Sequence, residues 1–294
     1  MNTEIINIQT EDGVINDGFI IKNNSKKILI ATHGMGSNCF KEREKIIAKN
    51  VLENGIDFLV YNNRGSELVK NVRKNVDGTI KKVIAGTSYE DPEEGYFDIK
   101  GAIEKAVSFG YTDIYLQGHS LGSTKVLYTY NKLKNENSEL IKYIKGIVLL
   151  SLIDIPKVTK IYLNENYEKI LNFAIEKEKN KQLLDLMPRE SFIHPISVKT
   201  FLKYTKYSDK IDFAKYSEEN YDYKELNNIN IPLFMRWGNI NEMIEQPAEV
   251  LTKIVSEKIN NKNKNIGYID GADHGYTGKE EILAKEIVEF LRKI

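Results

Sequence analysis

The stretch Ile114-Tyr115-Leu116-Gln117-Gly118-His119-Ser120-Leu121-Gly122 decides how the rest of the chain is interpreted. An apolar run is followed at once by the pattern G-x-S-x-G and then by a helical segment. By itself the pentapeptide recurs by chance, but in this strand–turn–helix context it is typical of a serine on a sharp, strained turn. The positions two residues before and after the serine must be small, because the strand and helix backbones crowd there. Ser120 is therefore the predicted nucleophile.

Short apolar runs of three to five residues recur along the chain, with amphipathic segments between them. Runs of this kind are typical of strands buried on both faces of a parallel sheet. The predicted fold class is α/β, with a mostly parallel central sheet and helices on both faces. Ligands of such sheets bind at the carboxyl ends of the strands. The expected strands are Ile28–Thr32, Phe58–Tyr61, Ile114–Leu116, Ile147–Leu150, Leu233–Trp237 and Ile266–Ile269, and the expected helices are 41–54, 96–109, 122–134, 246–259 and 279–293.

Two antiparallel hairpins are also expected. Ile5–Ile8 and Val14–Ile21 alternate between apolar and polar residues, with Gly13 near the turn between them. A second hairpin is predicted within residues 66–95, where Asp77-Gly78 lies between β-favouring residues.

Residues 155–225 form an insertion that is much longer than a normal connection between two strands. The segment carries seven of the 17 tyrosines and helical patterns such as Tyr167–Ile175. We interpret it as a helical lid over the binding site, because long insertions at the active end of a sheet usually shape that site. The alternative is a surface elaboration that merely packs. The core domain would then consist of residues 1–154 and 226–294.

The loop His33-Gly34-Met35-Gly36-Ser37-Asn38 follows the strand Ile28–Thr32. A His-Gly pair at this position is typical of the loop that supplies one oxyanion donor in sites with a serine elbow. We expect the main-chain N–H groups of Met35 and Leu121 to be the two donors, each contributing about 3–4 kcal/mol to the transition state. The alternative is a glycine turn without a catalytic role.

The general base is predicted to be a late histidine, since the chain order with such an elbow is serine, acid, histidine. His274 lies in Gly271-Ala272-Asp273-His274-Gly275, between the last predicted strand and the last predicted helix. His33 and His119 are expected to be structural. His194, in the insertion, is interpreted as a packing or solvent-exposed residue.

Beyond these motifs, the string from Glu94 to Tyr130, Tyr61–Gly65 (YNNRG) and Arg236–Ile244 (RWGNINEMI) resemble the α/β-hydrolase superfamily over nearly the whole chain. Within it, the chain resembles the branch once grouped as a domain of unknown function, whose fungal members include a siderophore esterase. The resemblance implies an α/β-hydrolase fold and a serine hydrolase, and it supports a glutamate as the acid. Superfamily members often have D-x-R-G where this chain has Asn62-Asn63-Arg64-Gly65, a change for which we expect no catalytic penalty.

The acid is usually an aspartate three residues after the glycine that ends the penultimate strand of this superfamily, and here that position is Asn241. An amide orients imidazole poorly, and aspartate to asparagine costs about 10⁴ in turnover in a serine protease. Glu242 is the first choice, because its extra methylene can cover a one-residue offset. Asp154, just past the strand Ile147–Leu150, is the alternative. The remaining candidates are Glu245, Asp270 and Asp273.

Composition excludes several classes of protein. Hydrophobic residues make up 41% and charged residues 29% of the 294 positions, as in ordinary globular proteins. The 42 basic and 42 acidic residues cancel, so the net charge does not favour nucleic acid as a partner. Cys39 is the one cysteine, which excludes an internal disulfide and a cysteine-rich zinc site. No apolar stretch approaches the ~20 residues that span a bilayer, and Met1–Thr10 lacks the pattern of a signal peptide, so the expected location is the cytoplasm.

Together these features predict a carboxylic ester hydrolase that acts on a small molecule through an acyl-enzyme, without metal or organic cofactor. A thioesterase, amidase or acyltransferase would use the same residues. Two other classes stay open: a non-hydrolytic receptor with this fold, and a cofactor-free lyase or perhydrolase. The sequence leaves the acyl group, the alcohol and the oligomeric state undetermined.

Overall fold

The computed structural model describes residues 2–294, and its centre is a ten-stranded sheet. The order across the sheet is β10-β9-β8-β7-β3-β4-β2-β5-β6, and β1 pairs with β2. The strands are β1 (Asn2–Gln9), β2 (Val14–Lys22), β3 (Lys27–Thr32), β4 (Asp57–Tyr61), β5 (Lys70–Val76), β6 (Thr79–Ala85), β7 (Asp113–His119), β8 (Ile144–Leu150), β9 (Leu233–Gly238) and β10 (Lys264–Ile269).

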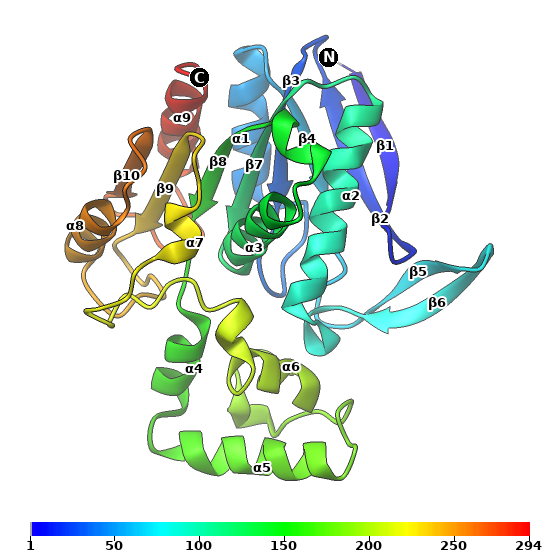
Figure 1. Ribbon diagram of the computed structural model, residues 1–294, viewed down its shortest axis with the longest axis vertical. Coiled ribbons are helices and arrows are strands. Elements are labelled where there is room, and N and C mark those ends of the chain that lie inside the picture. Colours follow the sequence, from blue (N-terminus) through cyan, green and yellow to red (C-terminus); the bar gives the residue numbers. More distant parts are fainter. Residues whose placement is uncertain (1) are drawn as a thin grey trace.

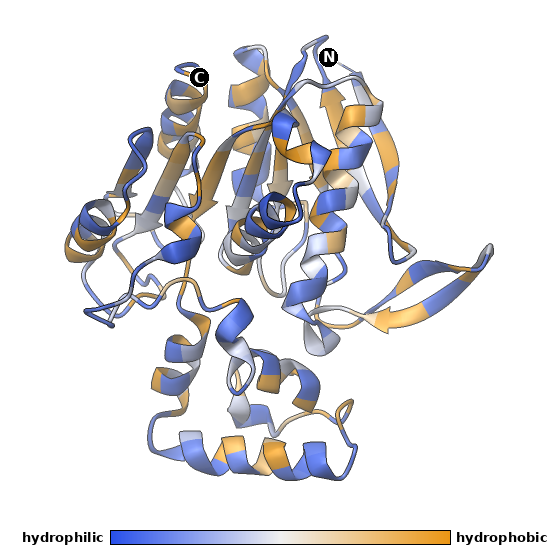
Figure 2. Ribbon diagram, in the orientation of Figure 1, coloured by the Kyte–Doolittle hydropathy of each residue, from blue (hydrophilic) through white to orange (hydrophobic). Residues whose placement is uncertain are grey.

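The middle of the sheet is parallel, as the short apolar runs predicted. Strands β4, β3, β7, β8, β9 and β10 pair in parallel, one with the next. Every residue of β4 is buried, and so are all residues of β3 after Lys27, which fits strands covered on both faces. Figure 2 shows apolar stretches along the central strands and a mixture of apolar and polar residues along the surface helix α5 (Tyr167–Lys179).

Both predicted hairpins are confirmed. Strands β1 and β2 pair antiparallel, and β2 in turn pairs antiparallel with β4 and β5. Strands β5 and β6 are joined by Asp77 and Gly78, whose φ angles are 50° and 83°. Two central residues with positive φ make the tight turn that suits the twist of a hairpin, and aspartate followed by glycine tolerates it best.

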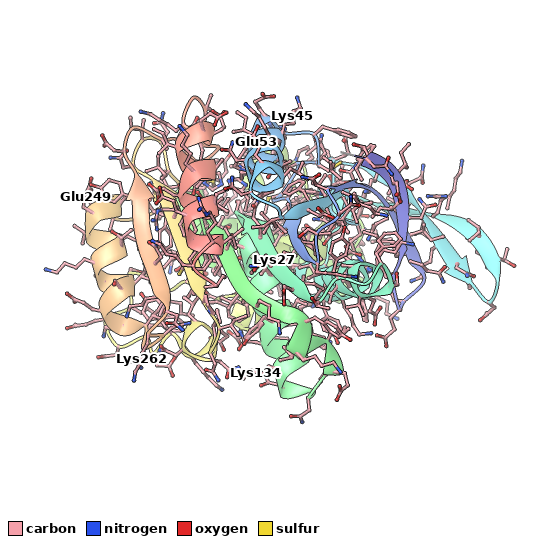
Figure 3. The ribbon with its side chains drawn as sticks, turned by 90° about the horizontal axis from the view of Figure 1, so that it is seen from above. Lys27, Lys45, Glu53, Lys134, Glu249 and Lys262 are labelled. Atoms are coloured by element: carbon pink, nitrogen blue, oxygen red, sulfur yellow. The ribbon has the colours of Figure 1, made fainter. Side chains whose placement is uncertain are left out.

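Helices cover both faces of the sheet. On one face α1 (Glu42–Glu53) packs beside α9 (Glu280–Leu291), through residues such as Ile47 and Leu283. On the other face lie α2 (Gly95–Ser108), α3 (Leu121–Asn135) and α8 (Ala248–Lys258), which share one large apolar cluster. Figure 3, a view from above, shows α1 with Lys45 and Glu53 on one side of the sheet and α3 with Lys134 on the other.

The insertion between β8 and β9 carries α4 (Ile155–Leu163), α5 and α6 (Val198–Tyr204), which lie beyond one end of the sheet in Figure 1. These helices pack around an apolar cluster of their own, which also includes Leu121. Residues from Phe213 onward join the main core instead, through Tyr216, Tyr223 and the short helix α7 (Lys224–Asn227). Within residues 2–294, no helix is both long and apolar enough to cross a bilayer.

Candidate active site

Ser120 sits on the turn between β7 and α3 in a strained conformation. Its φ is 54° and its ψ is −125°, values that residues other than glycine rarely adopt. The Ser120 N–H donates a hydrogen bond of 2.8 Å to the Leu150 carbonyl at the end of the neighbouring strand β8. Strain of this kind persists only where the surrounding structure holds it, and it is common at functional sites.

The two glycines of the pentapeptide are needed because three backbones meet at this turn. A Cβ on Gly118 would lie 2.4 Å from the Gly122 carbonyl oxygen, and a Cβ on Gly122 would lie 2.3 Å from the Thr32 carbonyl oxygen. Real Cβ atoms do not approach backbone atoms this closely. The crowding predicted from the sequence is confirmed, and it includes β3 as well as β7 and α3.

His274 lies in the loop between β10 and α9 and borders the same two cavities as Ser120. Its loop is tied to the serine turn by His119, whose Nε2 donates a hydrogen bond of 2.7 Å to the His274 carbonyl. Burial, with help from the charge of Arg43, lowers the pKa of His119 well below its usual range, so its ring stays neutral. His119 therefore has a structural contact, as expected, and the contact connects the two loops of the site.

Glu242 contacts His274 directly. Its Oε1 meets the His274 Nδ1 and also accepts from the Met243 N–H at 2.9 Å, while Oε2 accepts from Ser151 Oγ at 2.7 Å and the Gly238 N–H at 2.9 Å. Burial raises the pKa of Glu242, but these hydrogen bonds, led by the one from His274, outweigh it and hold the pKa below its usual value. An ionised carboxylate at Nδ1 keeps a proton on that nitrogen, which leaves Nε2 free to accept one.

Asn241, at the position where the resemblance places an aspartate, serves the backbone. Its φ is 51°, in the left-handed region that asparagine tolerates better than most residues. The loop turns sharply at this residue, and Glu242 follows it as the residue that reaches His274. The residue that contacts His274 is thus one position later than the position where the resemblance places an aspartate.

Asp154 is used for something else. It is the N-cap of α4, and its Oδ1 accepts from the Lys157 N–H at 2.9 Å. Burial raises its pKa to about 7, and the negative charges of Asp212 and Glu245 add to the effect. Among the described residues, the one carboxylate hydrogen-bonded to the His274 ring is that of Glu242.

The other acid candidates also have different partners. Asp270 accepts from the Asn239 side chain at 2.9 Å, Asp273 accepts from the main-chain N–H groups of Gly275 and Thr277 at 3.0 and 2.8 Å, and Glu245 lies 3.8 Å from Lys157 Nζ.

The two expected oxyanion donors are both near Ser120. Leu121 follows it in the chain, and Met35 lies in a loop that is close to it in space. Leu121 is the first residue of α3, where main-chain N–H groups have no partner within the helix. Met35 follows Gly34, and a Cβ on Gly34 would lie 3.0 Å from Ser120 Cβ. Among the hydrogen bonds of residues 2–294, neither N–H donates to another protein atom. Both donors are therefore available to a ligand.

The remaining histidines hold the loop around Met35. His33 Nδ1 donates to the Gly34 carbonyl at 2.9 Å, and its Nε2 accepts from the Asn63 N–H at 3.2 Å. Burial lowers the pKa of His33 to about 3, so its ring is neutral. His194 is a packing residue of the insertion, and a Cβ on Gly36 would lie 2.9 Å from its Nε2.

Two cavities of different character meet at Ser120 and His274. One has a volume of about 120 Å³ and mostly apolar walls, and the other, called the polar cavity below, has a volume of about 420 Å³ and mixed walls that include several charged side chains. The apolar cavity is also lined by Met35, Ile153, Ile155, Val158, Thr159, Tyr162, Phe192, Ile193 and Met243. The polar cavity is also lined by Gly34, Met35, Gly36, Ser37, Lys41, Glu42, Arg43, His119, Gly275, Thr277 and Glu280.

This arrangement can be compared with known proteins. Residues 86–287 match the family model described as lecithin:cholesterol acyltransferase. The chain belongs to this family. No curated protein sequence matches the chain.

Solved structures extend the likeness of this acyltransferase-family protein to almost its whole length. Est1E from Butyrivibrio proteoclasticus, with bound ferulic acid, has a TM-score of 0.67 at 16% identity, over 98% of this chain and 98% of its own. The Pyrococcus furiosus esterase Pf2001 reaches 0.61 at 20% identity, over 99% and 91%. The α/β hydrolase GrgF from Penicillium sp. sh18 reaches 0.69 at 15% identity, over 100% and 99%. These structures confirm the fold predicted from the sequence, and the family match together with them supports the predicted α/β-hydrolase superfamily.

Two residues of this family member that support the site were not predicted from the sequence. Ser151 Oγ donates to Glu242 and lies 3.0 Å from the Tyr276 hydroxyl, which donates to the Arg236 carbonyl at 2.7 Å. Ser151 comes directly after β8, so a polar side chain at the carboxyl end of a buried strand was the signal that could have pointed to it. No local pattern marks Tyr276.

Proposed function

We propose that the protein is a serine hydrolase that cleaves carboxylic esters, with Ser120 as nucleophile, His274 as general base and Glu242 as the acid that orients it. The observation that carries the proposal is the contact of the buried Glu242 carboxylate with His274 Nδ1, beside a serine on a strained turn. This combination matches the requirements of a nucleophile, a base and a group that orients the base.

In the first half of the reaction, the Ser120 hydroxyl oxygen attacks the ester carbonyl carbon while His274 Nε2 takes the hydroxyl proton. The carbonyl oxygen becomes an oxyanion, to which the Met35 and Leu121 N–H groups donate. The bond to the alcohol oxygen then breaks, and His274 gives its proton to the leaving alcohol. Glu242 keeps the imidazole in the correct tautomer and stabilises its cationic form.

In the second half, a water molecule attacks the acyl-enzyme while His274 Nε2 takes one of its protons. The bond between the acyl carbon and Ser120 Oγ breaks, and His274 returns the proton to the serine. The products are a carboxylic acid and the free enzyme. A thioester or amide would follow the same route, and an alcohol in place of water would make the reaction an acyl transfer.

The insertion, residues 155–225, is proposed to be a lid on the core formed by residues 1–154 and 226–294, with its last part from Phe213 onward packed into that core. Helix α4 and the segment around Phe192 provide walls of the apolar cavity beside Ser120. Ordered insertions that border a reactive centre usually select the substrate.

Covalent labelling together with ester hydrolysis tests this function. The wild type is expected to react with a fluorophosphonate probe and to hydrolyse p-nitrophenyl esters, and Ser120→Ala is expected to do neither. Ser108→Ala is the matched control, because Ser108 is exposed at the end of α2 and its loss should change nothing.

Three outcomes would overturn the proposal in different ways. A Ser120→Ala enzyme with more than about a hundredth of the wild-type rate would show that the nucleophile is wrong. A wild type that is neither labelled nor active would favour a receptor. Labelling without ester hydrolysis, together with a different product, would favour a lyase or perhydrolase.

A further inference from the structure

The two cavities that meet at Ser120 and His274 differ enough to define the substrate. The apolar cavity is walled by Ile153, Ile155, Val158, Phe192, Ile193 and Met243. The polar cavity is bordered by Lys41 and Arg43 near the start of α1 and by Glu280 at the start of α9. An ester bound at Ser120 would therefore place one side of its carbonyl in an apolar environment and the other in a more polar one with charged side chains.

The volume of the apolar cavity limits what fits there. It holds about 120 Å³. In another protein, an engineered apolar cavity of about 150 Å³ binds benzene. A group of roughly two to six carbon atoms therefore fits this cavity, whereas a long fatty chain would have to leave it or displace the lid.

The walls also exclude a charged group. Thr159 Oγ1, a polar atom at this cavity, already donates to the Ile155 carbonyl at 2.8 Å. Tyr162, which also lines the cavity, is 48% exposed and therefore stays in contact with water. An ionised group in such a pocket would lose its hydration without gaining a partner, which is strongly unfavourable.

The polar cavity suits the alcohol. It is larger, at about 420 Å³, and its charged side chains have both signs. After acylation the alcohol must leave and water must reach the acyl carbon, while the acyl group stays bound. A polar, roomy cavity beside His274 serves both steps, so the apolar cavity is left for the acyl group.

We infer that the substrate is an ester between a short, uncharged acyl group and a polar, hydroxyl-bearing alcohol. This inference rests on the proposed function. It narrows that function to esters with short acyl groups. The residues that limit the acyl length are Val158 on α4 and Ile193 in the same lid.

The test is a series of p-nitrophenyl esters from acetyl to lauroyl. The wild type is expected to have its highest kcat/KM near butyryl, with at least a tenfold fall by lauroyl. Val158→Phe fills the cavity and should lower the butyryl rate relative to the acetyl rate about tenfold, a typical effect of one or two methylene groups in a pocket. Ile193→Ala should move the optimal acyl length toward octanoyl. Because this wall residue is 38% exposed, its truncation should not unfold the protein.

Ile161→Phe is the matched control, because Ile161 lies on the same helix, is 56% exposed and does not line the cavity. Its acyl-length profile should equal that of the wild type. For the alcohol, glycerol monobutyrate should be hydrolysed faster than hexyl butyrate. A profile that rises to lauroyl, or cavity variants that leave it unchanged, would overturn the acyl assignment, and a preference for hexyl butyrate would overturn the alcohol assignment. Either of these results would leave the proposed function intact. If the protein hydrolyses no ester at all, the proposed function and the substrate inference are both overturned.

A second, independent observation concerns Thr87, which lies at the start of the short helix Thr87–Tyr89, after the β5–β6 hairpin. The Thr87 side chain is fully buried. Its Oγ1 accepts from the Gly36 N–H at 2.6 Å and donates to the Gly65 carbonyl at 2.8 Å. The hydroxyl therefore joins the loop after β3 to the loop after β4.

The bond to Gly36 fixes the peptide that follows Met35. Gly36 has a φ of 61°, a conformation with little steric restraint in glycine, so its peptide needs an external partner to hold one orientation. The Gly36 N–H points toward Thr87, and the Met35 N–H has no hydrogen-bond acceptor among residues 2–294. We propose that Thr87 is a positioning residue for the oxyanion donor Met35.

The same short helix also holds the lid. The Ser197 N–H donates to the Ser88 carbonyl at 2.7 Å, and Thr200 Oγ1 lies 3.2 Å from the same carbonyl and 2.9 Å from the Glu90 carbonyl. Residues 87 and 88 thus contact the oxyanion loop on one side and the lid on the other. A change at Thr87 should therefore act on the geometry of the reactive centre before it acts on the fit of the acyl group.

Thr87→Val tests this role, because valine keeps the shape and removes the hydroxyl. We expect kcat to fall about 10- to 100-fold, as for small misplacements of catalytic groups, with KM within about threefold of the wild-type value. Thr87→Ser, which restores the hydroxyl, should recover most of the rate. Thr129→Val is the matched control, since Thr129 is equally buried and its hydroxyl has no partner among the described residues.

An unchanged kcat in Thr87→Val, or a rise in KM with kcat unchanged, would overturn the role of Thr87. So would a serine variant no more active than the valine variant. If Thr87→Val fails to fold, Thr87→Ala carries the same comparison with a smaller side chain.

Discussion

The reactive centre and the lid are held in place in different ways. Ser120, Glu242 and their neighbours are fixed by hydrogen bonds at the strand ends, such as the one from the Ser120 N–H to Leu150 on the neighbouring strand and the one from the Gly238 N–H to Glu242 in the following loop. The lid helices α4, α5 and α6 instead pack around their own apolar cluster. We therefore expect the proposed chemistry to depend on the core sheet and the selection of substrate to depend on the separately packed lid.

The two regions meet at a few residues, and this limits their independence. The Leu121 side chain belongs to the lid cluster, while its N–H is one of the proposed oxyanion donors. Met35, the other donor, packs against the same cluster. Lid changes should therefore affect turnover modestly, and core changes should abolish it.

The largest expected effect is that of removing the base. His274→Ala should lower kcat by about 10⁶, close to the loss expected for Ser120→Ala, because residues that act as one unit are not additive. Rates with p-nitrophenyl butyrate measure this, and Ser108→Ala at the exposed end of α2 is the control. A His274 variant that retains more than about a hundredth of the activity would mean that the core does not supply the base from this loop.

The next effect in size is that of the acid. Glu242→Gln keeps the shape but removes the charge, and turnover should fall by about 10⁴, as when a triad carboxylate becomes an amide. Asp154→Asn should change turnover little, because Asp154 caps α4 and does not touch His274. The opposite ranking of the two variants would place the acid at the end of β8 instead of in the loop after β9.

The sequence could predict the parts of this molecule that depend on local patterns. Short apolar runs identified the parallel strands, and Asp77-Gly78 identified a hairpin turn, because each has a distinct local signature. The proposed acid was harder to choose from the sequence, since no local pattern indicates that Asn241 has a left-handed φ or that Glu242, the next residue, contacts His274. Ser151 could not be assigned a role either, because its partners lie 91 and 125 residues away along the chain.

A smaller effect is expected from replacing the lid. Substitution of residues 164–209 by a short linker keeps Phe213 and the later residues in the main core. Turnover of p-nitrophenyl acetate should stay within about tenfold of the wild type, since the acetyl group makes little use of the pocket, while discrimination between butyryl and lauroyl esters should be lost. A variant that loses acetate turnover but keeps its acyl-length profile would show that the lid belongs to the reactive centre, and the comparison would fail.

The smallest expected effect is on stability and comes from Asp154, at the junction of core and lid. Its pKa is raised from 3.8 to about 7 by burial and by the nearby charges of Asp212 and Glu245, which Lys157 only partly offsets. An acid whose pKa is raised by folding keeps its proton up to a higher pH in the folded chain than in the unfolded one. Its contribution to stability is therefore fully present below 3.8 and is lost as the pH rises through about 7.

Asp154→Asn removes this dependence and keeps the helix cap, because asparagine caps as well as aspartate. The two proteins should melt at similar temperatures near about pH 4, and at about pH 8 the variant should melt several degrees higher, where 1 kcal/mol corresponds to roughly 2–4 °C. Thermal unfolding followed by circular dichroism across this range measures the difference. Equal melting temperatures at about pH 8, or a variant that is less stable there, would contradict this prediction. The ionised Asp154 carboxylate would then not destabilise the junction between core and lid.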